Sequence, residues 1–176
     1  MSANLSIHHL RHPGLLDHVR SVLDASGLDP SSLCLELTES VLLEDVDRHM
    51  RTLLELRALG VRLAIDDFGT GFSSLTYLKR FPVDAVKVDR SFVAGLGTDA
   101  SDTAIVRSVI DLAHALSLQV VAEGVERPEQ LEALQSLGCD LAQGYLFAPP
   151  LPAEELLLWL AAPRAWAERP VARVMS

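Results

Sequence analysis

Short apolar runs alternate with longer amphipathic stretches along most of this chain. The runs have the length of β-strands, and most of them end in a polar or acidic residue followed by Gly or Ser. They lie at residues 2–6, 33–39, 62–69, 84–90, 118–125 and 139–145. We therefore predict six strands, and the landmarks near their carboxyl ends recur at intervals that suit successive strand–helix units.

Between these runs, apolar residues recur at the spacing of a helix face. The pattern predicts helices over residues 13–25, 45–59, 102–116, 129–137 and 153–161. Gly27, Gly60 and Gly138 mark three of the helix ends, and Pro128 stands at a favoured first helical position. An uninterrupted order of strand, helix, strand, helix is typical of an α/β fold with a parallel sheet. Residues 163–176 show little periodicity, and we expect a loose tail there.

Polar side chains gather at the predicted strand ends, which is where α/β barrels and sheets carry their functional residues. Alternation in the second run places Glu36 on the face opposite the leucines, and alternation in the fourth places Lys87 on the same face as Asp89. Large apolar residues would pack on the helices, while small or polar ones point into the centre. The side chains expected at the centre are Glu36, Asp66, Lys87, Glu123 and Gln143, with Asp67 and Glu39 at its rim.

Several acids around one lysine favour a metal site over a set of structural roles. A single acid after a strand is usually a helix N-cap or a solvated loop residue, and Lys87 alone would usually be an ion-pair partner. Buried carboxylates that converge cannot all stay ionised without cations. Their oxygens suit hard ions such as Mg²⁺ or Mn²⁺ rather than zinc. Adjacent Asp66 and Asp67 could serve two such ions, which clamp the attacking and leaving oxygens of a phosphoryl centre.

Three other motifs suggest different chemistry. His8, His9 and His12 resemble a metal cluster, but histidines that enter an amphipathic helix more often form a solvated face. Asp67-Phe68-Gly69 resembles a kinase motif, yet no glycine-rich nucleotide loop or catalytic-loop pattern accompanies it. Lys87 at a barrel-strand end could form a Schiff base. The surrounding carboxylates would hold its amine protonated, which makes this a distant alternative.

Composition and charge narrow the class of protein. The chain has 176 residues, 49% of them hydrophobic, and a formal net charge of −9. These values fit a globular domain and exclude general disorder, while the acidic balance argues against a partner such as DNA, RNA or an anionic membrane. No apolar run approaches the roughly 20 residues of a membrane span, and the amino terminus has no signal-peptide pattern. With only Cys34 and Cys139, we expect a cytoplasmic protein.

Five motifs carry a resemblance to a known family. ELTES, DDFGTGFSSL, VKVDRSF, VVAEGVE and AQGYLF occur in this order and resemble the EAL domain of bacterial cyclic di-GMP phosphodiesterases, over residues 4–151 or so. The resemblance implies a modified (β/α)₈ TIM-like barrel. It also implies hydrolysis of one phosphodiester bond of cyclic di-GMP to give linear pGpG, with two Mg²⁺ or Mn²⁺ ions.

The resemblance also assigns roles to individual residues. Asn4, Glu36, Asp66 and Asp67 would be metal ligands. Glu123 would complete the shell of the second metal or help to activate water, and Lys87 would hold the nucleophilic water or a phosphate oxygen. Glu39 would anchor the loop that couples dimerisation to metal binding, formed by Phe68, Gly69, Thr70 and Gly71. Support for the site and the ligand would come from Asp89, Glu126 and Gln143.

The sequence departs from the family at its amino-terminal end. The Glu-Ala-Leu signature, which supplies a metal ligand, is missing from its place, and so is the arginine that follows it and contacts ligand phosphate. The tripeptide at 132–134 lies in a predicted helix and is a decoy. Asn4 belongs to what should be the third strand. We therefore expect residues 1–162 to hold an EAL domain with about six of its eight β/α units.

Such a truncation predicts consequences for the molecule. Six strands cannot close an eight-stranded barrel, so two sheet edges and an apolar interior would be left open. A homodimer or another pairing through the open edges would cover them. Met1 stands where the family has Val, so a longer gene product is also expected. Two alternatives to the enzyme remain: an impaired domain that binds cyclic di-GMP or a protein partner, and a fragment without independent function.

Overall fold

The computed structural model describes residues 1–39, 41, 45–70 and 78–161. Its centre is one parallel sheet in the order β1-β2-β3-β4-β5-β6, in which each strand pairs with its neighbours along the chain. The strands are β1 (Ser2–Asn4), β2 (Cys34–Thr38), β3 (Arg62–Phe68), β4 (Ala85–Val88), β5 (Gln119–Ala122) and β6 (Leu141–Ala142). This confirms the predicted α/β fold with six parallel strands. The predicted tail, residues 163–176, lies outside the described ranges.

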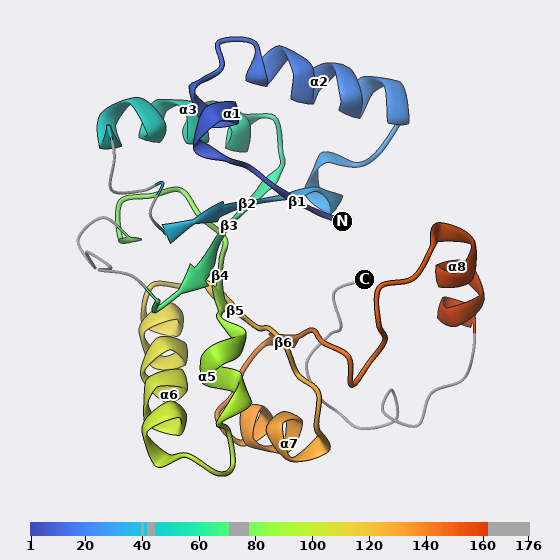
Figure 1. Ribbon diagram of the computed structural model, residues 1–176. Coiled ribbons are helices and arrows are strands. Elements are labelled where there is room, and N and C mark those ends of the chain that lie inside the picture. Colours follow the sequence, from blue (N-terminus) through green and yellow to red (C-terminus); the bar gives the residue numbers. More distant parts are fainter. Residues whose placement is uncertain (40, 42–44, 71–77, 162–176) are drawn as a thin grey trace.

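Helices lie on the convex side of this curled sheet, which has the form of an incomplete barrel (Figure 1). They include α2 (Leu15–Ser26), α3 (Val46–Ala58), α5 (Arg90–Ala94), α6 (Ala100–Ala115) and α7 (Pro128–Ser136). The short helix α1 (Ile7–Arg11) follows β1, a 3₁₀ turn spans Pro30–Ser32, and α8 (Ala153–Ala161) lies apart from the sheet (Figure 1). In the described sheet β1 and β6 each have a single neighbour, so both edges are open, as predicted.

Two short helices and several strand ends were not predicted. α1 and α5 have five residues each, too few for an apolar period to appear. Both begin at a side-chain cap: Ser6 Oγ accepts a hydrogen bond from the His9 amide, and Asp89 accepts one from the Ser91 amide. The predicted strands at 2–6 and 84–90 were therefore too long. The strand expected at 139–145 was also too long, since only Leu141–Ala142 pairs.

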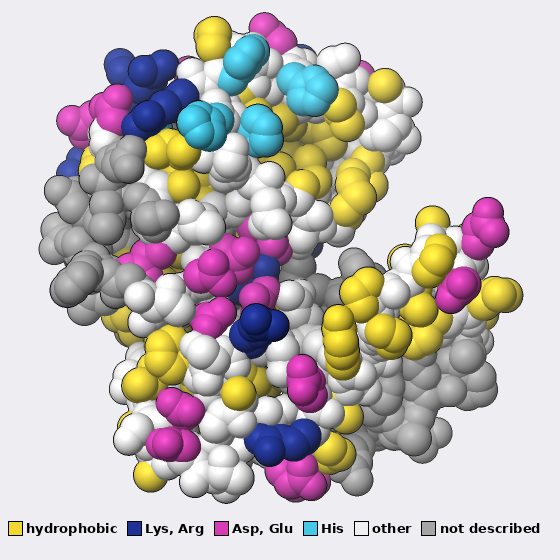
Figure 2. Space-filling view, viewed as in Figure 1, with side chains coloured by type: hydrophobic (Ala, Val, Ile, Leu, Met, Phe, Trp, Pro, Cys, Tyr) yellow, Lys and Arg dark blue, Asp and Glu magenta, His cyan; other side chains and the backbone are white. Residues whose placement is uncertain are grey.

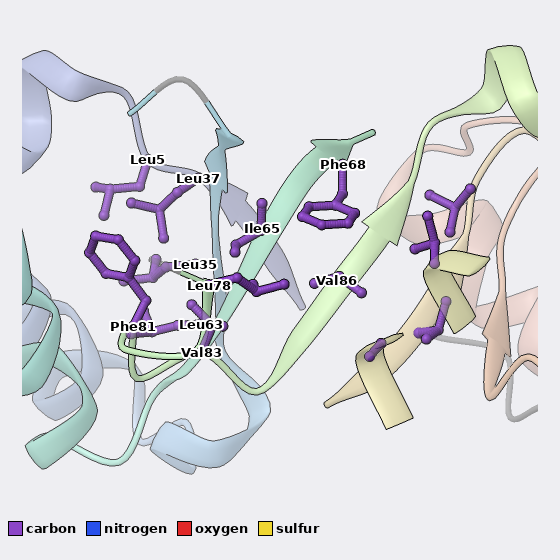
Figure 3. Packing of buried hydrophobic residues seen from close by; sticks show 14 of the residues in the cluster. Leu5, Leu35, Leu37, Leu63, Ile65, Phe68, Leu78, Phe81, Val83 and Val86 are labelled. Carbon is purple, nitrogen blue, oxygen red and sulfur yellow. The ribbon is translucent and has the colours of Figure 1, made fainter. Parts of the chain in front are cut away.

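The sheet separates its side chains as the alternation predicted. Large apolar residues of β2, β3 and β4, such as Leu37, Ile65 and Val86, pack in the core beneath the helices (Figure 3). Cys34, Ala64 and Ala85 form a separate small cluster on the concave side. They are 4, 2 and 8% exposed, so the prediction of an open apolar interior is wrong at these positions. The curled sheet brings these side chains together around a cavity of only about 10 Å³.

Aspartates fix the stagger of neighbouring strands at the opposite end of the sheet. Asp84, just before β4, accepts a hydrogen bond from the Leu63 amide of β3 at 2.9 Å. Asp140, just before β6, accepts one from the Val120 amide of β5 at 2.8 Å. Each carboxylate thereby satisfies a backbone donor of the preceding strand. The strand ends that carry the polar residues are aligned as a result.

α8 differs from the other long helices in having no buried residue. Its side chains Leu157, Leu158 and Leu160 are 70, 75 and 49% exposed, and the helix stands apart from the sheet in Figure 1. Apolar surface of this kind marks an interaction face. Within the described residues, no helix combines the length and the apolar character that crossing a membrane requires.

Candidate active site

The ammonium group of Lys87 lies at the centre of the polar side chains at the carboxyl ends of the strands. Its Nζ is 2.7 Å from Glu36 Oε2 on β2 and 2.9 Å from Asp66 Oδ1 on β3. It is 2.5 Å from Oε1 of Glu123, the residue directly after β5. Gln143, which follows β6, donates a hydrogen bond from Nε2 to the same Glu123 oxygen at 2.6 Å. The structure therefore brings together all five residues expected at the centre.

Electrostatics hold Lys87 in its charged form. Burial by itself would lower the pKa of its amine, but hydrogen bonds with Glu123, Glu36 and Asp66 outweigh burial and raise that pKa. Burial also raises the pKa of Glu123, although Lys87 opposes this rise. A Schiff base would require a neutral amine as nucleophile, and this arrangement disfavours it.

A β-bulge explains how two consecutive aspartates serve one site. Ile65 of β3 pairs with Val86 and Phe68 pairs with Val88, so β3 has one residue more than β4 between the paired positions. Asp67 has a φ of 53°, in the left-handed region. Regular alternation would point adjacent side chains to opposite faces, and the extra residue removes this constraint.

Three carboxylates form a group that can hold a metal ion. One oxygen each of Asp66, Asp67 and Glu123 lies within 4.8 Å of the others. Burial, Asp66 and Asp89 together raise the pKa of Asp67, because each disfavours another negative charge there. A hard divalent cation would relieve this repulsion and would find the oxygen ligands that it prefers. The donor set therefore fits the ions that the sequence predicted.

A cavity of about 650 Å³ opens next to this group. One wall consists of Glu36, Asp66 and Asp67, and the other is built by β1 and the start of α1. Asn4 lines the cavity and pairs in register with Glu36, so its amide group belongs to the same end of the sheet. Figure 2 shows acidic side chains gathered in the hollow between the two halves of the molecule.

The loop after β3 is tied to the end of β2. The Gly69 amide donates a hydrogen bond to Glu39 Oε2 at 3.2 Å, and the Thr70 hydroxyl donates one to the Asp67 carbonyl at 2.8 Å. Phe68 is buried in the main core, so it fixes the start of the loop rather than contacting a ligand (Figure 3). Gly71 lies outside the described residues.

Two predicted support residues take positions outside the carboxylate group. Asp89 caps α5 through the Ser91 amide and lies close enough to Asp67 to raise the pKa of that carboxyl. Glu126 is exposed, and its backbone amide donates a hydrogen bond to Gln130 Oε1. The tripeptide at residues 132–134 lies within α7, as expected of a decoy.

Sequence reasoning did not place a histidine in the cavity. His8 and His12 are exposed, as expected of a solvated face, and His9 is exposed as well. However, His9 also lines the cavity beside the acids. The spacing of apolar residues did not indicate that His9 lines the cavity, because helix α1 is too short to be predicted from such spacing. Its N-cap, the Ser of NLS, was the available clue.

Comparison with known proteins gives a consistent result. The model of the EAL domain family matches residues 1–150. MucR of Pseudomonas aeruginosa, a bifunctional diguanylate cyclase/cyclic di-GMP phosphodiesterase, is 47% identical over 161 residues. That alignment covers 92% of this chain and 24% of MucR. The chain thus spans about a quarter of the length of this relative.

Solved structures share the fold. The phosphodiesterase PaMucR in complex with c-di-GMP has a TM-score of 0.84 and 48% identity, over 88% of this chain and 63% of that one. A manganese/cy-diGMP complex of Klebsiella pneumoniae BlrP1 has a TM-score of 0.79 and 40% identity, over 85% of this chain and 38% of that one. A calcium/cy-diGMP complex of BlrP1 has a TM-score of 0.78.

Proposed function

The chain belongs to the EAL domain family, and from this premise we propose that it hydrolyses one phosphodiester bond of cyclic di-GMP to give linear pGpG. The convergence of Glu36, Asp66 and Glu123 on Lys87 carries the proposal. These charged groups come from separate strands and occupy the carboxyl-terminal end of the sheet, where barrel enzymes act. Cyclic di-GMP in the solved complexes of relatives supports the choice of substrate.

The acids beside the cavity would hold two ions, Mg²⁺ or Mn²⁺. Asn4, Glu36, Asp66, Asp67 and Glu123 are the proposed ligands. Bound divalent ions there would supply Lewis-acid stabilisation of negative charge on the phosphoryl oxygens. Manganese in a BlrP1 complex supports this class of ion.

The residues of the chain have distinct tasks in the proposed reaction. The oxygen of water attacks phosphorus, the bond from phosphorus to the ribose 3′ oxygen breaks, and that oxygen gains a proton. Lys87 holds the attacking water or a phosphate oxygen through its ammonium protons. Glu123 accepts a proton from water, and its raised pKa suits this task. Gln143 fixes the Glu123 carboxylate by its hydrogen bond of 2.6 Å.

Hydrolysis by residues 1–176 alone is expected to be slow, because this segment holds neither the signature glutamate nor the arginine after it. Loss of a contact that stabilises the transition state lowers the reaction rate. The rate falls about tenfold for every 1.4 kcal/mol of stabilisation that is removed. The alternative to hydrolysis is a domain that binds cyclic di-GMP without cleaving it. Both activities use the same cavity, so a single experiment separates them.

That experiment incubates the purified chain with cyclic di-GMP and Mn²⁺ and follows pGpG by chromatography. We expect product that is lost when EDTA removes the metal, because the carboxylates need cations to bind an anionic substrate. The binding of cyclic di-GMP is measured in parallel, because it identifies a domain that binds the dinucleotide without cleaving it. A folded chain that binds cyclic di-GMP and yields no pGpG would contradict hydrolysis, and one that does not bind would contradict both activities.

We further propose that the chain acts in the cytoplasm and pairs through its open edges, most simply as a homodimer. The free edge of β1 and the exposed leucines of α8 support pairing. Light scattering should give the mass of two chains, about twice 19.1 kDa. Replacing Leu157 and Leu158 by glutamate should shift the mass to one chain. If light scattering gives the original chain the mass of a single chain, the proposed pairing is refuted.

A further inference from the structure

One wall of the cavity contains a histidine that the proposed reaction does not use. His9 lies on α1, and the cavity that it lines also contains Glu36, Asp66 and Asp67. Among the described residues that line this cavity, His9 is the one basic side chain. All the formal charges on the facing wall are negative.

Ser6 orients the ring of His9. The Ser6 hydroxyl oxygen accepts a hydrogen bond from the His9 amide at 3.3 Å and lies 3.1 Å from His9 Nδ1. When the Ser6 hydroxyl donates its proton to Nδ1, the ring proton of neutral His9 lies on Nε2, and that tautomer is the one the contact favours for donation into the cavity. The contacts known within the described part of the chain leave Nε2 without a partner.

The backbone that carries His9 is held firmly. Leu5 and Leu10, on either side of the turn, are 6 and 3% exposed. The Leu5 amide also donates a hydrogen bond to the Glu36 carbonyl at 2.7 Å, which ties this turn to the strand that bears a proposed metal ligand. The turn that carries His9 is therefore held at a constant position relative to the acids.

Cyclic di-GMP needs a hydrogen-bond donor in this cavity. It carries two phosphodiester anions about a ring, and ions held by the carboxylates would neutralise charge at the one that is cleaved. The second anion must lie in an otherwise acidic cavity, where its repulsion by carboxylates requires a hydrogen-bond donor.

We propose that His9 is a substrate-binding residue, whose Nε2–H donates a hydrogen bond to a phosphate oxygen of cyclic di-GMP. This inference rests on the proposed function of the cavity. Ser6 is then a positioning residue, since it acts on the substrate only through the His9 ring.

The test compares three variants with the original chain. His9→Ala removes the donor, His9→Gln keeps a side-chain N–H, and His8→Ala removes an exposed histidine from the same helix. Equilibrium binding of cyclic di-GMP is measured with Ca²⁺, and KM and kcat with Mn²⁺. We expect His9→Ala to raise Kd and KM about tenfold with little change in kcat. A change of this size corresponds to the loss of one hydrogen bond to a charged group. His9→Gln should recover most of the affinity, and His8→Ala should match the original chain.

Melting temperatures check that each variant is folded. Because His9 is exposed, the melting temperatures of all three variants should agree with that of the original chain. Equal Kd values for His9→Ala and the original chain would overturn the contact while leaving the proposed function intact. The same holds if His8→Ala weakens binding as much as His9→Ala. An original chain that does not bind cyclic di-GMP at all overturns the proposed function and this contact together.

Discussion

Replacing Asp66 by alanine is expected to lower kcat for cyclic di-GMP hydrolysis by about a thousandfold or more. The carboxylate belongs to the group that can hold a metal and also contacts Lys87 at 2.9 Å. Its loss removes a proposed metal ligand and frees the ammonium to shift toward Glu36 and Glu123. Loss of Lewis-acid stabilisation at the transition state is worth several kcal/mol, and each 1.36 kcal/mol is tenfold in rate. Initial rates in Mn²⁺ measure the effect.

A matched control separates this effect from a general loss of negative charge. Asp17 on α2 has a side chain that is 84% exposed, and Asp17→Ala should keep the full rate. Asp66→Ala should remain folded, because Lys87 keeps two of its three carboxylate partners. If Asp66→Ala hydrolyses cyclic di-GMP as fast as Asp17→Ala, the carboxylate group is not the catalytic metal site.

Replacing Lys87 by methionine is expected to reduce both stability and turnover. The side chain is 6% exposed, and its removal leaves Glu36, Asp66 and Glu123 without their shared cation. Breaking a buried ion pair on one side costs about 3–5 kcal/mol of unfolding free energy. Urea unfolding without metal should show a loss of that size. Turnover should fall by about two to three orders of magnitude, since a donor to the water or phosphate is gone.

Added metal gives this variant a distinctive signature. Mn²⁺ neutralises the same carboxylates and binds only the folded state, so it should restore much of the lost stability without restoring turnover. Lys79 is exposed and provides the control, because Lys79→Met should behave like the original chain in both assays. A Lys87→Met variant as stable without metal as Lys79→Met would show that the ion-pair cluster contributes little to the fold.

The sequence alone predicted the parallel sheet and most of the centre. Period-two alternation is a local property, and it assigned Glu36 and Lys87 to the same face before any contact was known. Strand–helix alternation then required that face to be shared by successive strands. The structure brings these residues, with Glu123 and Gln143, into hydrogen-bond distance.

Other parts of the site depend on features that no period reveals. The bulge in β3 inserts one residue, and regular alternation gives no reason for Asp66 and Asp67 to share a group. His9 belongs to the cavity only because Ser6 ends β1 early and starts a helix of five residues. Such short elements are set by single caps and by tertiary contacts, so composition and spacing do not expose them.

The Lys87 cluster also joins the sheet across its width. Its members come from β2, β3 and β4 and from the residue after β5, so one set of ionic contacts ties four consecutive strands at the same end. These strand ends therefore cannot fray independently. They should open as one cooperative unit, and occupancy of the site would slow amide hydrogen exchange along all four strand ends at once.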